Sequence, residues 1–242
     1  MIGILCAMPQ ELEAVATRLG FNGAPKTHGS TRIWRGRRGG TDLALALSGI
    51  GKVNAAAAAT VLLSAYGARS LVFSGVAGGL DPALPVGAVL LADRLAIHDY
   101  GLMSAGRLTP TTSGVIPVGA PRLEALAPVS PDVAAVMARL ALTLEGKVAG
   151  PIRLGGVTTA DYFLNCAQTR AELHEGLGAD AIDMESGAVA QVAAAWGAPL
   201  YVIRTLSDLA GEDSHLTIVQ MVHLASANSA VCVEALLDIL ES

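Results

Sequence analysis

Short, wholly apolar runs that alternate with helix-like segments are the feature of this sequence that most constrains its fold. Such runs occupy residues 2–7, 43–47 and 71–73, and amphipathic segments or glycine-rich turns follow them. Apolar runs of this length are typical of strands buried on both faces, and their alternation with helices indicates a mainly parallel sheet. The sequence therefore predicts an α/β fold: a single domain over residues 1–242 with a central, mostly parallel mixed sheet flanked by helices.

The first helix is expected at residues 9–19, because proline suits the first helical turn and the apolar residues at 12, 15, 16 and 19 form one stripe. Residues 100–130 contain scattered Gly and Pro without a clear period, and we expect a loop or lid there. The cluster Arg35, Arg37 and Arg38 is expected to form a solvent-exposed turn. The other expected elements are strands at 88–96, 152–157 and 200–204 and helices at about 52–66, 131–144, 184–196 and 217–240.

Composition and charge exclude several classes of protein. The chain is 52% hydrophobic and 15% charged, which is not typical of a disordered chain. It carries 16 Lys+Arg against 21 Asp+Glu, so it lacks the basic surface expected of a protein that binds nucleic acid. The apolar stretches at 55–63 and 188–203 are too short or too interrupted to span a membrane, and the N-terminus does not resemble a signal peptide. Three scattered cysteines suit a reducing compartment, so we expect a cytoplasmic protein.

Two glycine-rich segments follow expected strands without matching a nucleotide-binding template. In the first, Gly49-Ile50-Gly51-Lys52, Ala46 replaces the first glycine of a Walker A loop, and Asn54 replaces the third glycine of a dinucleotide fingerprint. The second segment, 74–79, fits neither template. We interpret these glycines as tight turns that let the backbone approach a small ligand, with packing alone as the alternative.

Three acidic residues also follow expected strands: Glu11, Glu185 and Asp208. Each has a structural explanation, since a carboxylate stabilises the start of a helix and Asp can cap one. In a parallel sheet, however, ligands bind beyond the carboxyl ends of the strands. One pocket formed by several strand ends is therefore expected.

Five segments contain these residues in a recognisable order. They are IGILCAMPQE at 2–11, SGIGKVNA at 48–55, SGVAGGL at 74–80, DMESGAVA at 183–190 and VIRTLSD at 202–208. With these motifs, over nearly its whole length, the chain resembles the nucleoside phosphorylase/nucleosidase superfamily, and most closely its 5′-methylthioadenosine/S-adenosylhomocysteine nucleosidase branch. The resemblance implies hydrolysis of a purine nucleoside with release of adenine, without a metal or organic cofactor, by a homodimer.

The resemblance also implies catalytic roles for two residues. Glu11 is expected to activate the attacking water, and Asp208 is expected to protonate purine N7. Cleavage of an N-glycosidic bond builds positive charge on the ribose and negative charge on the purine, so an acid and a base on opposite faces suit the reaction. Attack opposite the leaving group predicts inversion at the anomeric carbon, with α-ribose formed first.

The remaining expected site residues bind the substrate. Glu185 and Met184 are expected at the ribose, Phe163 against the base, and Met8 and Ile50 along the ribose and its 5′ side; Val76, Leu164 and Ser207 complete the substrate-binding set. Val76 stands where relatives usually carry a small hydroxyl residue, and Tyr162 where they carry a small one. Tyr162 is therefore expected to narrow the purine end or to reach the substrate.

Alternatives to this interpretation remain. A phosphorolytic purine nucleoside phosphorylase would need an anion site, but residues 73–80 contain no arginine. Arg204 lies near the expected site, where pairing with a carboxylate explains it equally well. A hydrolase of another modified nucleoside, such as futalosine, is a second alternative. A non-catalytic nucleoside-binding or storage protein is a third, which retention of all three carboxylates argues against.

Overall fold

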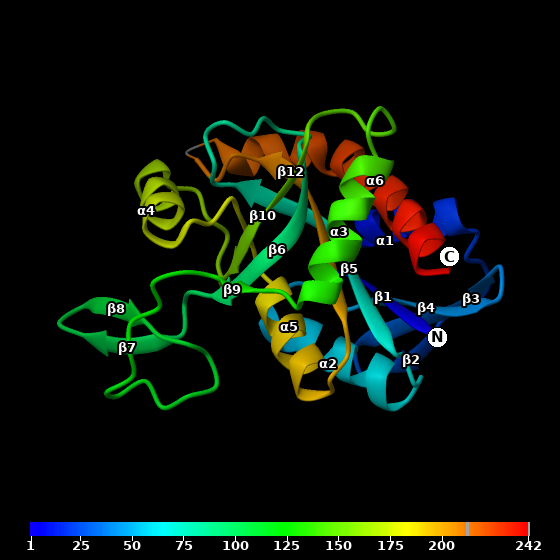
Figure 1. Ribbon diagram of the computed structural model, residues 1–242, viewed down its shortest axis with the longest axis horizontal. Coiled ribbons are helices and arrows are strands. Elements are labelled where there is room, and N and C mark those ends of the chain that lie inside the picture. The colour runs from blue at the N-terminus through cyan, green and yellow to red at the C-terminus, as the bar shows by residue number, and fades with distance from the viewer. Residues whose placement is uncertain (212, 242) are drawn as a thin grey trace.

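The computed structural model describes residues 1–211 and 213–241; for Leu216 it describes the backbone but not the side chain. This part of the chain forms a ten-stranded mixed sheet with helices on both faces (Figure 1). The expected α/β fold class is confirmed. The proposed single domain, 1–242, includes residues 212 and 242, which lie outside the described residues.

The sheet combines parallel and antiparallel pairings. The order is β11 (Ala181–Asp183), β10 (Ile152–Thr159), β6 (Val89–Ile97), β12 (Leu200–Asp208), β5 (Ser70–Gly79), β1 (Ile2–Cys6), β4 (Thr41–Leu47), β3 (Thr31–Arg38) and β2 (Lys26–His28), with β9 (Ala127–Pro128) beside β6. β1 pairs in parallel with β4 and β5, and β5 pairs in parallel with β12. β11 pairs with both β10 and β5, so that β5, β12, β6, β10 and β11 form a closed ring.

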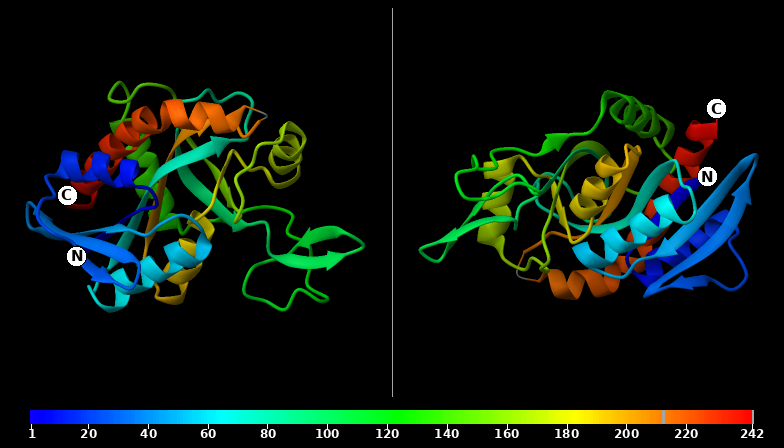
Figure 2. Two further views of the ribbon diagram at one scale, coloured as in Figure 1. Left: turned by 180° about the vertical axis from the view of Figure 1, so that it is seen from behind. Right: turned by 90° about the horizontal axis from the view of Figure 1, so that it is seen from below.

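Two groups of helices cover the two faces of the sheet (Figure 2). On one face α2 (Lys52–Ser64) packs against α5 (Ser186–Ala195), and the small side chains of α2 allow close approach to the strands. On the other face lie α1 (Pro9–Leu19), α3 (Pro131–Thr143) and α6 (Ser214–Glu241). The remaining helix, α4 (Ala167–Leu177), packs at the side through partly buried leucines. The strand ends between these layers are left free to form a site.

Within the part of the chain that the structure describes, one helix is long and apolar enough to cross a membrane by length and composition. Within the segment Thr217–Glu241 of α6, an 18-residue window has a mean hydropathy of 1.3, but 67% of that window is buried inside the protein. It packs on α1, β12, β5 and α3. A helix buried in this way is typical of the core of a soluble protein.

Several expectations about local structure were wrong. The glycines at 74–79 do not form tight turns, because β5 continues through them to Gly79, and the strand expected at 200–204 continues to Asp208 as β12. The arginine cluster at 35–38 is not a turn; it lies on β3, where Arg38 pairs with Asp238 of α6 at 2.6 Å. These segments are strands because neighbouring strands pair with them, despite their glycine or arginine content.

The region 100–130, expected to be a loop or lid, contains a small hairpin of β7 (Gly101–Ser104) and β8 (Arg107–Pro110). This hairpin projects from the body of the protein as an arm (Figures 1 and 2). Trp196 is half exposed at the end of α5. Both features add apolar surface outside the core.

Candidate active site

The ten residues selected from the sequence line one cavity, of about 110 Å³, where the ends of β1, β5, β11 and β12 meet. Tyr162 and Asp183 also line it. The strand topology explains the convergence, since β1, β5 and β12 run parallel and β11 reaches β5 by closing the ring. The ten are Met8, Glu11, Ile50, Val76, Phe163, Leu164, Met184, Glu185, Ser207 and Asp208.

Glu11 is held by backbone donors in the first turn of α1. Proline begins this helix directly after β1, so the chain turns and directs the carboxylate back toward the sheet. The Ala7 and Met8 amides donate to Oε2 at 2.8 and 2.9 Å, and the Val76 amide donates to Oε1 at 2.9 Å. Burial raises the pKa of Glu11, while Arg204 and the three amides oppose the rise. These donors favour an ionised carboxylate.

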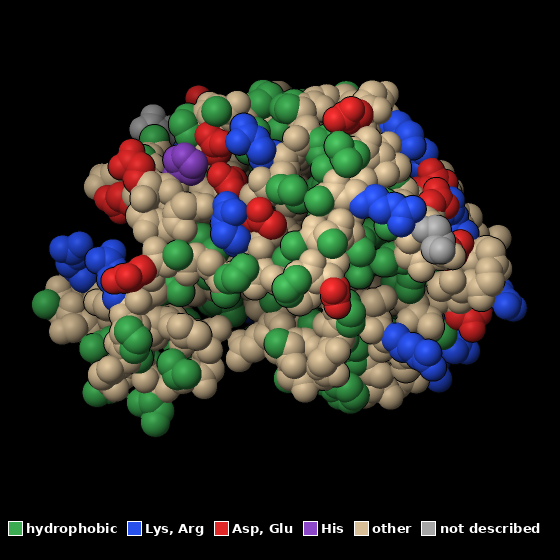
Figure 3. All heavy atoms as spheres, viewed as in Figure 1, with side chains coloured by type: hydrophobic (Ala, Val, Ile, Leu, Met, Phe, Trp, Pro, Cys, Tyr) green, Lys and Arg blue, Asp and Glu red, His purple; other side chains and the backbone are tan. Residues whose placement is uncertain are grey.

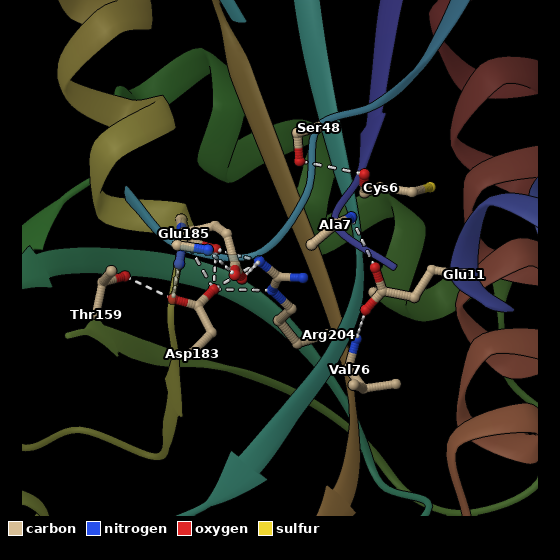
Figure 4. A network of polar contacts seen from close by, with 12 residues as sticks. Cys6, Ala7, Glu11, Ser48, Val76, Thr159, Asp183, Glu185 and Arg204 are labelled. Carbon is tan, nitrogen blue, oxygen red and sulfur yellow. Dashed lines mark hydrogen bonds and ion pairs between the residues drawn. The ribbon is translucent and has the colours of Figure 1, made fainter. Parts of the chain in front are cut away.

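Arg204 of β12 is fully buried between acidic groups (Figure 4). Its Nη2 lies 2.7 Å from Asp183 Oδ2 and 3.7 Å from Glu185 Oε2. Its guanidinium carbon lies 4.0 Å from the centre of the Phe73 ring. The expected pairing of Arg204 with a carboxylate is therefore present.

One nitrogen of Arg204 is left without a partner. Its Nη1 is buried and makes no hydrogen bond to the described residues. A Cβ built on Gly75 would lie 2.6 Å from this nitrogen and 2.3 Å from Glu11 Oε1. Glu11 and Arg204 therefore approach the same position of β5, which only glycine leaves open. A buried N–H without a partner costs about 1–3 kcal/mol, so this donor suits a ligand or a bound water.

Glu185 ends the loop after β11 and occupies the N-cap position of α5, although its side chain makes no capping hydrogen bond. Its Oε1 accepts a hydrogen bond of 2.9 Å from the Gly51 amide, which ties it to the loop before α2. Burial and the nearby charge of Asp183 raise the pKa of Glu185, and Arg204 opposes the rise. One edge of this carboxylate is thus fixed by the backbone and by Arg204, next to the cavity.

Asp208 stands at the carboxyl end of β12, opposite Gly78 of β5. It is 1% exposed and accepts hydrogen bonds from the Ala210 amide at 2.8 Å and from the Ser207 hydroxyl at 3.0 Å. The described residues form no ion pair with it. Burial raises the pKa of Asp208, and the hydrogen bonds oppose the rise only in part. This environment favours a protonated carboxyl group.

Comparisons with known proteins identify the family of the chain. A family model described as the phosphorylase superfamily matches residues 1–238. The chain is 38% identical to a 5′-methylthioadenosine/S-adenosylhomocysteine nucleosidase of Mycobacterium bovis over 252 residues, covering 99% of this chain and 97% of the relative.

Solved structures are similar over the whole chain. A nucleosidase of the same name from Helicobacter pylori is 27% identical with a TM-score of 0.85, covering 98% of this chain and 97% of that one. A futalosine hydrolase of Helicobacter pylori has the same identity, TM-score and coverage. The chain belongs to the phosphorylase superfamily. Within this class it is a nucleosidase, a hydrolase of N-glycosidic bonds.

Two features of the cavity were not resolved from the sequence. The free Nη1 of Arg204 depends on acidic partners that are distant in sequence, and only the glycine at 75 indicated a close approach. Tyr162 was noted for its bulk, but its partner is His98, which lies 64 positions earlier. Cys166, near Phe163 in sequence, is exposed and does not line the cavity.

Proposed function

We propose that this nucleosidase hydrolyses 5′-methylthioadenosine and S-adenosylhomocysteine, releasing adenine, with water as the second substrate and no cofactor. The observation that carries the proposal is the pair of unlike buried carboxylates in one cavity. Glu11 contacts β5 at Val76, and Asp208 lies opposite Gly78, two positions further along the same strand. Two strand positions correspond to roughly 7 Å, enough to place a nucleoside's reacting bond between them.

Glu11 is the base in this proposal. Its carboxylate takes a proton from water while the water oxygen bonds to C1′ of the ribose. The unpartnered Nη1 of Arg204, beside the same position of β5, donates a hydrogen bond to that water. This contact substitutes for a hydroxyl at position 76, where the chain carries Val76.

Asp208 is the acid. The C1′–N9 bond breaks with its electron pair going to the purine, and Asp208 delivers a proton to N7. A general acid must be protonated when the substrate arrives, and the buried position of Asp208 without an ion pair supports that state. Water attacks opposite the departing base, so the sugar product forms first as the α-anomer.

The other cavity residues orient the nucleoside. Glu185 accepts hydrogen bonds from the ribose hydroxyls beside Met184, and Phe163, which is 44% exposed, stacks on the base. Ser207 supports Asp208 through its hydroxyl. The remaining contacts to the nucleoside are apolar and come from Met8, Ile50, Val76 and Leu164.

Water is favoured over phosphate as the acceptor. Among the described residues that line the cavity, four are carboxylates and none is lysine or arginine. Arg204 lies beside the cavity, but Asp183, Glu185 and Glu11 surround its charge. A phosphate dianion would meet net negative charge there, and cationic donors are what phosphate sites use.

Adenine release, measured by chromatography with and without phosphate, tests the proposal. The substrates are methylthioadenosine, adenosylhomocysteine, adenosine and futalosine. Release of adenine from the first two without phosphate is expected. Strict dependence on phosphate would identify a phosphorylase, and turnover of futalosine alone would move the chain to the futalosine hydrolases.

We also propose a cytoplasmic homodimer. A hollow of about 820 Å³ lies between α2, α5 and the loop at 113–117, which follows the projecting arm in the chain, and it shares no lining residue with the catalytic cavity. Val53 and Ile116 at this hollow are each 80% exposed, and hydrophobic side chains lie over the arm in Figure 3. Exposed apolar surface of this kind is typical of an interface, and a second copy supplies the same surface. Light scattering is expected to give twice the mass of the chain, and Val53→Glu to reduce it to one copy. The three cysteines are free of disulfide bonds, which supports a reducing compartment such as the cytoplasm.

A further inference from the structure

Tyr162 is a large side chain that enters the substrate cavity. It is 39% exposed and lies in the lining together with Glu185 and Phe163. Its function depends on which end of the cavity it faces. The contacts of the segment 161–166 answer this question, because the two ends of the segment are bound to different parts of the site.

The start of the segment lies beside Glu185. Asp161 Oδ1 accepts a hydrogen bond of 2.8 Å from the Lys52 amide. The neighbouring Gly51 amide donates to Glu185 Oε1 at 2.9 Å. Tyr162 follows Asp161 directly, so it stands at the end of the cavity where the sugar binds in the proposed function.

The end of the segment lies beside Asp208. The Cys166 amide donates to the Ala210 carbonyl at 3.3 Å, and the Ala210 amide donates to Asp208 Oδ1. Leu164 is nearer to this end, so it faces the purine ring of the nucleoside in the proposed function. Of the two expectations for Tyr162, these contacts favour reaching the substrate at its sugar end over narrowing the purine end, which lies beside the later residues of the segment.

His98 holds the Tyr162 side chain in place. Its Nε2 lies 2.5 Å from the Tyr162 hydroxyl, and its Nδ1 lies 2.9 Å from the buried Thr158 hydroxyl. The two rings meet edge to face, with centroids 5.6 Å apart. Burial lowers the pKa of His98 to about 4 and raises that of Tyr162 to about 12, so both are neutral at pH 7. The tyrosine is thus fixed in the cavity rather than free to swing into solvent.

We propose that Tyr162, braced by His98, is a specificity residue that restricts the 5′ substituent of the nucleoside to small groups. In the proposed function the purine ring lies at the Asp208 end of the cavity and the ribose hydroxyls lie at Glu185. The 5′ substituent of the nucleoside then points past Ile50 toward Tyr162. A methylthio group fits the end of the cavity that Tyr162 narrows. The longer, charged homocysteinyl group must displace the Tyr162 ring. The enzyme therefore prefers methylthioadenosine to adenosylhomocysteine. This inference rests on the proposed function.

The chain offers a matched control for this pair. Tyr66 also meets a histidine ring edge to face, with its hydroxyl 3.2 Å from His28 Nε2 and centroids 5.5 Å apart. Neither residue lines the catalytic cavity. Tyr66→Ala removes an equivalent aromatic side chain and hydrogen bond at a position where the substrate does not bind.

The test is the ratio of kcat/KM for adenosylhomocysteine to that for methylthioadenosine. Tyr162→Ala is expected to raise this ratio by about tenfold or more, since small changes in a pocket wall alter discrimination on that scale. Tyr162→Phe keeps the ring but loses the tether, and is expected to raise it by less. Tyr66→Ala is expected to leave the ratio unchanged.

Two results would overturn the inference while leaving the proposed function intact. One is an unchanged ratio in Tyr162→Ala with methylthioadenosine still hydrolysed by the unmodified protein. The other is an equal rise in Tyr66→Ala, which would indicate a general loosening of the fold. If the unmodified protein hydrolysed neither nucleoside, the proposed function itself would fail, and the inference with it.

Discussion

The two carboxylates at the ends of the cavity are equally buried but are surrounded by different groups. Glu11 accepts hydrogen bonds from three backbone amides and lies near Arg204. Asp208 accepts hydrogen bonds from one amide, that of Ala210, and from the hydroxyls of Ser207 and Ser214, and within the described chain it has no ion pair. Burial raises the pKa of both, hydrogen-bond donors oppose the rise at both, and a nearby cation, Arg204, opposes it only at Glu11. The same burial therefore leaves a group suited to be a base at one end and a group suited to be an acid at the other.

This difference follows from how each end is built. Glu11 belongs to a helix that turns back over the sheet, where amides of β5 and of the β1–α1 turn point at it. Asp208 ends a strand, with Ala210 folding over it at positive φ. Fixed amides stabilise negative charge, while a dry strand end does not. If Glu11 and Asp208 responded alike to substitution and to pH, the assignment of one as the base and the other as the acid would be contradicted.

The largest effect is expected from Glu11→Gln. The amide side chain cannot take a proton from water, and its NH2 group faces at least one of the three backbone donors. Loss of the base alone gives a fall in kcat of up to about 10⁴-fold. The unsatisfied donor costs about 1–3 kcal/mol of stability. Steady-state kinetics and urea unfolding measure the two losses.

Glu13→Gln is the control for this substitution, because Glu13 is exposed two positions later in α1. It is expected to change neither quantity. A Glu11→Gln variant with normal turnover would remove Glu11 from the mechanism.

Asp208→Asn is expected to lower kcat by about 10³-fold, since a general acid is lost while the shape of the site is kept. In the unmodified enzyme kcat/KM falls at low pH as Glu11 is protonated and at high pH as Asp208 ionises. The variant is expected to lose the alkaline fall and keep the acid one. Asp81→Asn, which alters a buried carboxyl group outside the cavity, serves as the control.

The free energies of unfolding of Asp208→Asn and of the unmodified protein, measured as a function of pH, give a second test of the raised pKa of Asp208. A carboxyl group with a raised pKa binds its proton more tightly in the folded state, so its contribution to stability is full below its unfolded pKa, about 4, and is lost as the pH rises through the folded pKa. The free energy of unfolding of Asp208→Asn, minus that of the unmodified protein, should therefore increase across this range. A constant difference would contradict the raised pKa.

Arg204→Met tests the charge that distinguishes the Glu11 end. It leaves Asp183 and Glu185 buried without their cation, which costs about 3–5 kcal/mol. Loss of the donor to water lowers kcat by about 10²-fold in the folded fraction. Arg94→Met is the control, because Arg94 pairs with Asp180 at 3.3 Å near the surface, where an ion pair contributes little. Equal destabilisation by both variants would contradict a special role for Arg204.

Local signals in the sequence predicted the first helix to its exact ends, because proline at its start and glycine after it act within a few residues. They did not predict β3, whose arginines are polar and whose strand character depends on pairing with β4. The glycines of β5 suggested a loop, but β1, β11 and β12 pair with that segment. Motif order grouped the cavity residues, whereas partners distant in sequence, such as His98 for Tyr162, required the folded chain.

The smallest expected effect is that of Ser207→Ala, and it tests the Asp208 end most finely. The Ser207 hydroxyl donates to Asp208 Oδ2 at 3.0 Å, which stabilises the ionised form and lowers the pKa of Asp208. Without this donor the alkaline fall of kcat/KM should move to higher pH by about one unit, since a hydrogen bond to a charged group is worth about 1.5–3 kcal/mol and part of it is retained by other donors. At neutral pH kcat should change by less than about threefold, because the Ala210 amide still orients the Asp208 carboxyl group. Ser64→Ala on the exposed face of α2 is the control. A shift of the alkaline fall to lower pH would mean that Asp208 acts in its ionised form, and the contrast between the two ends of the cavity would then be reversed.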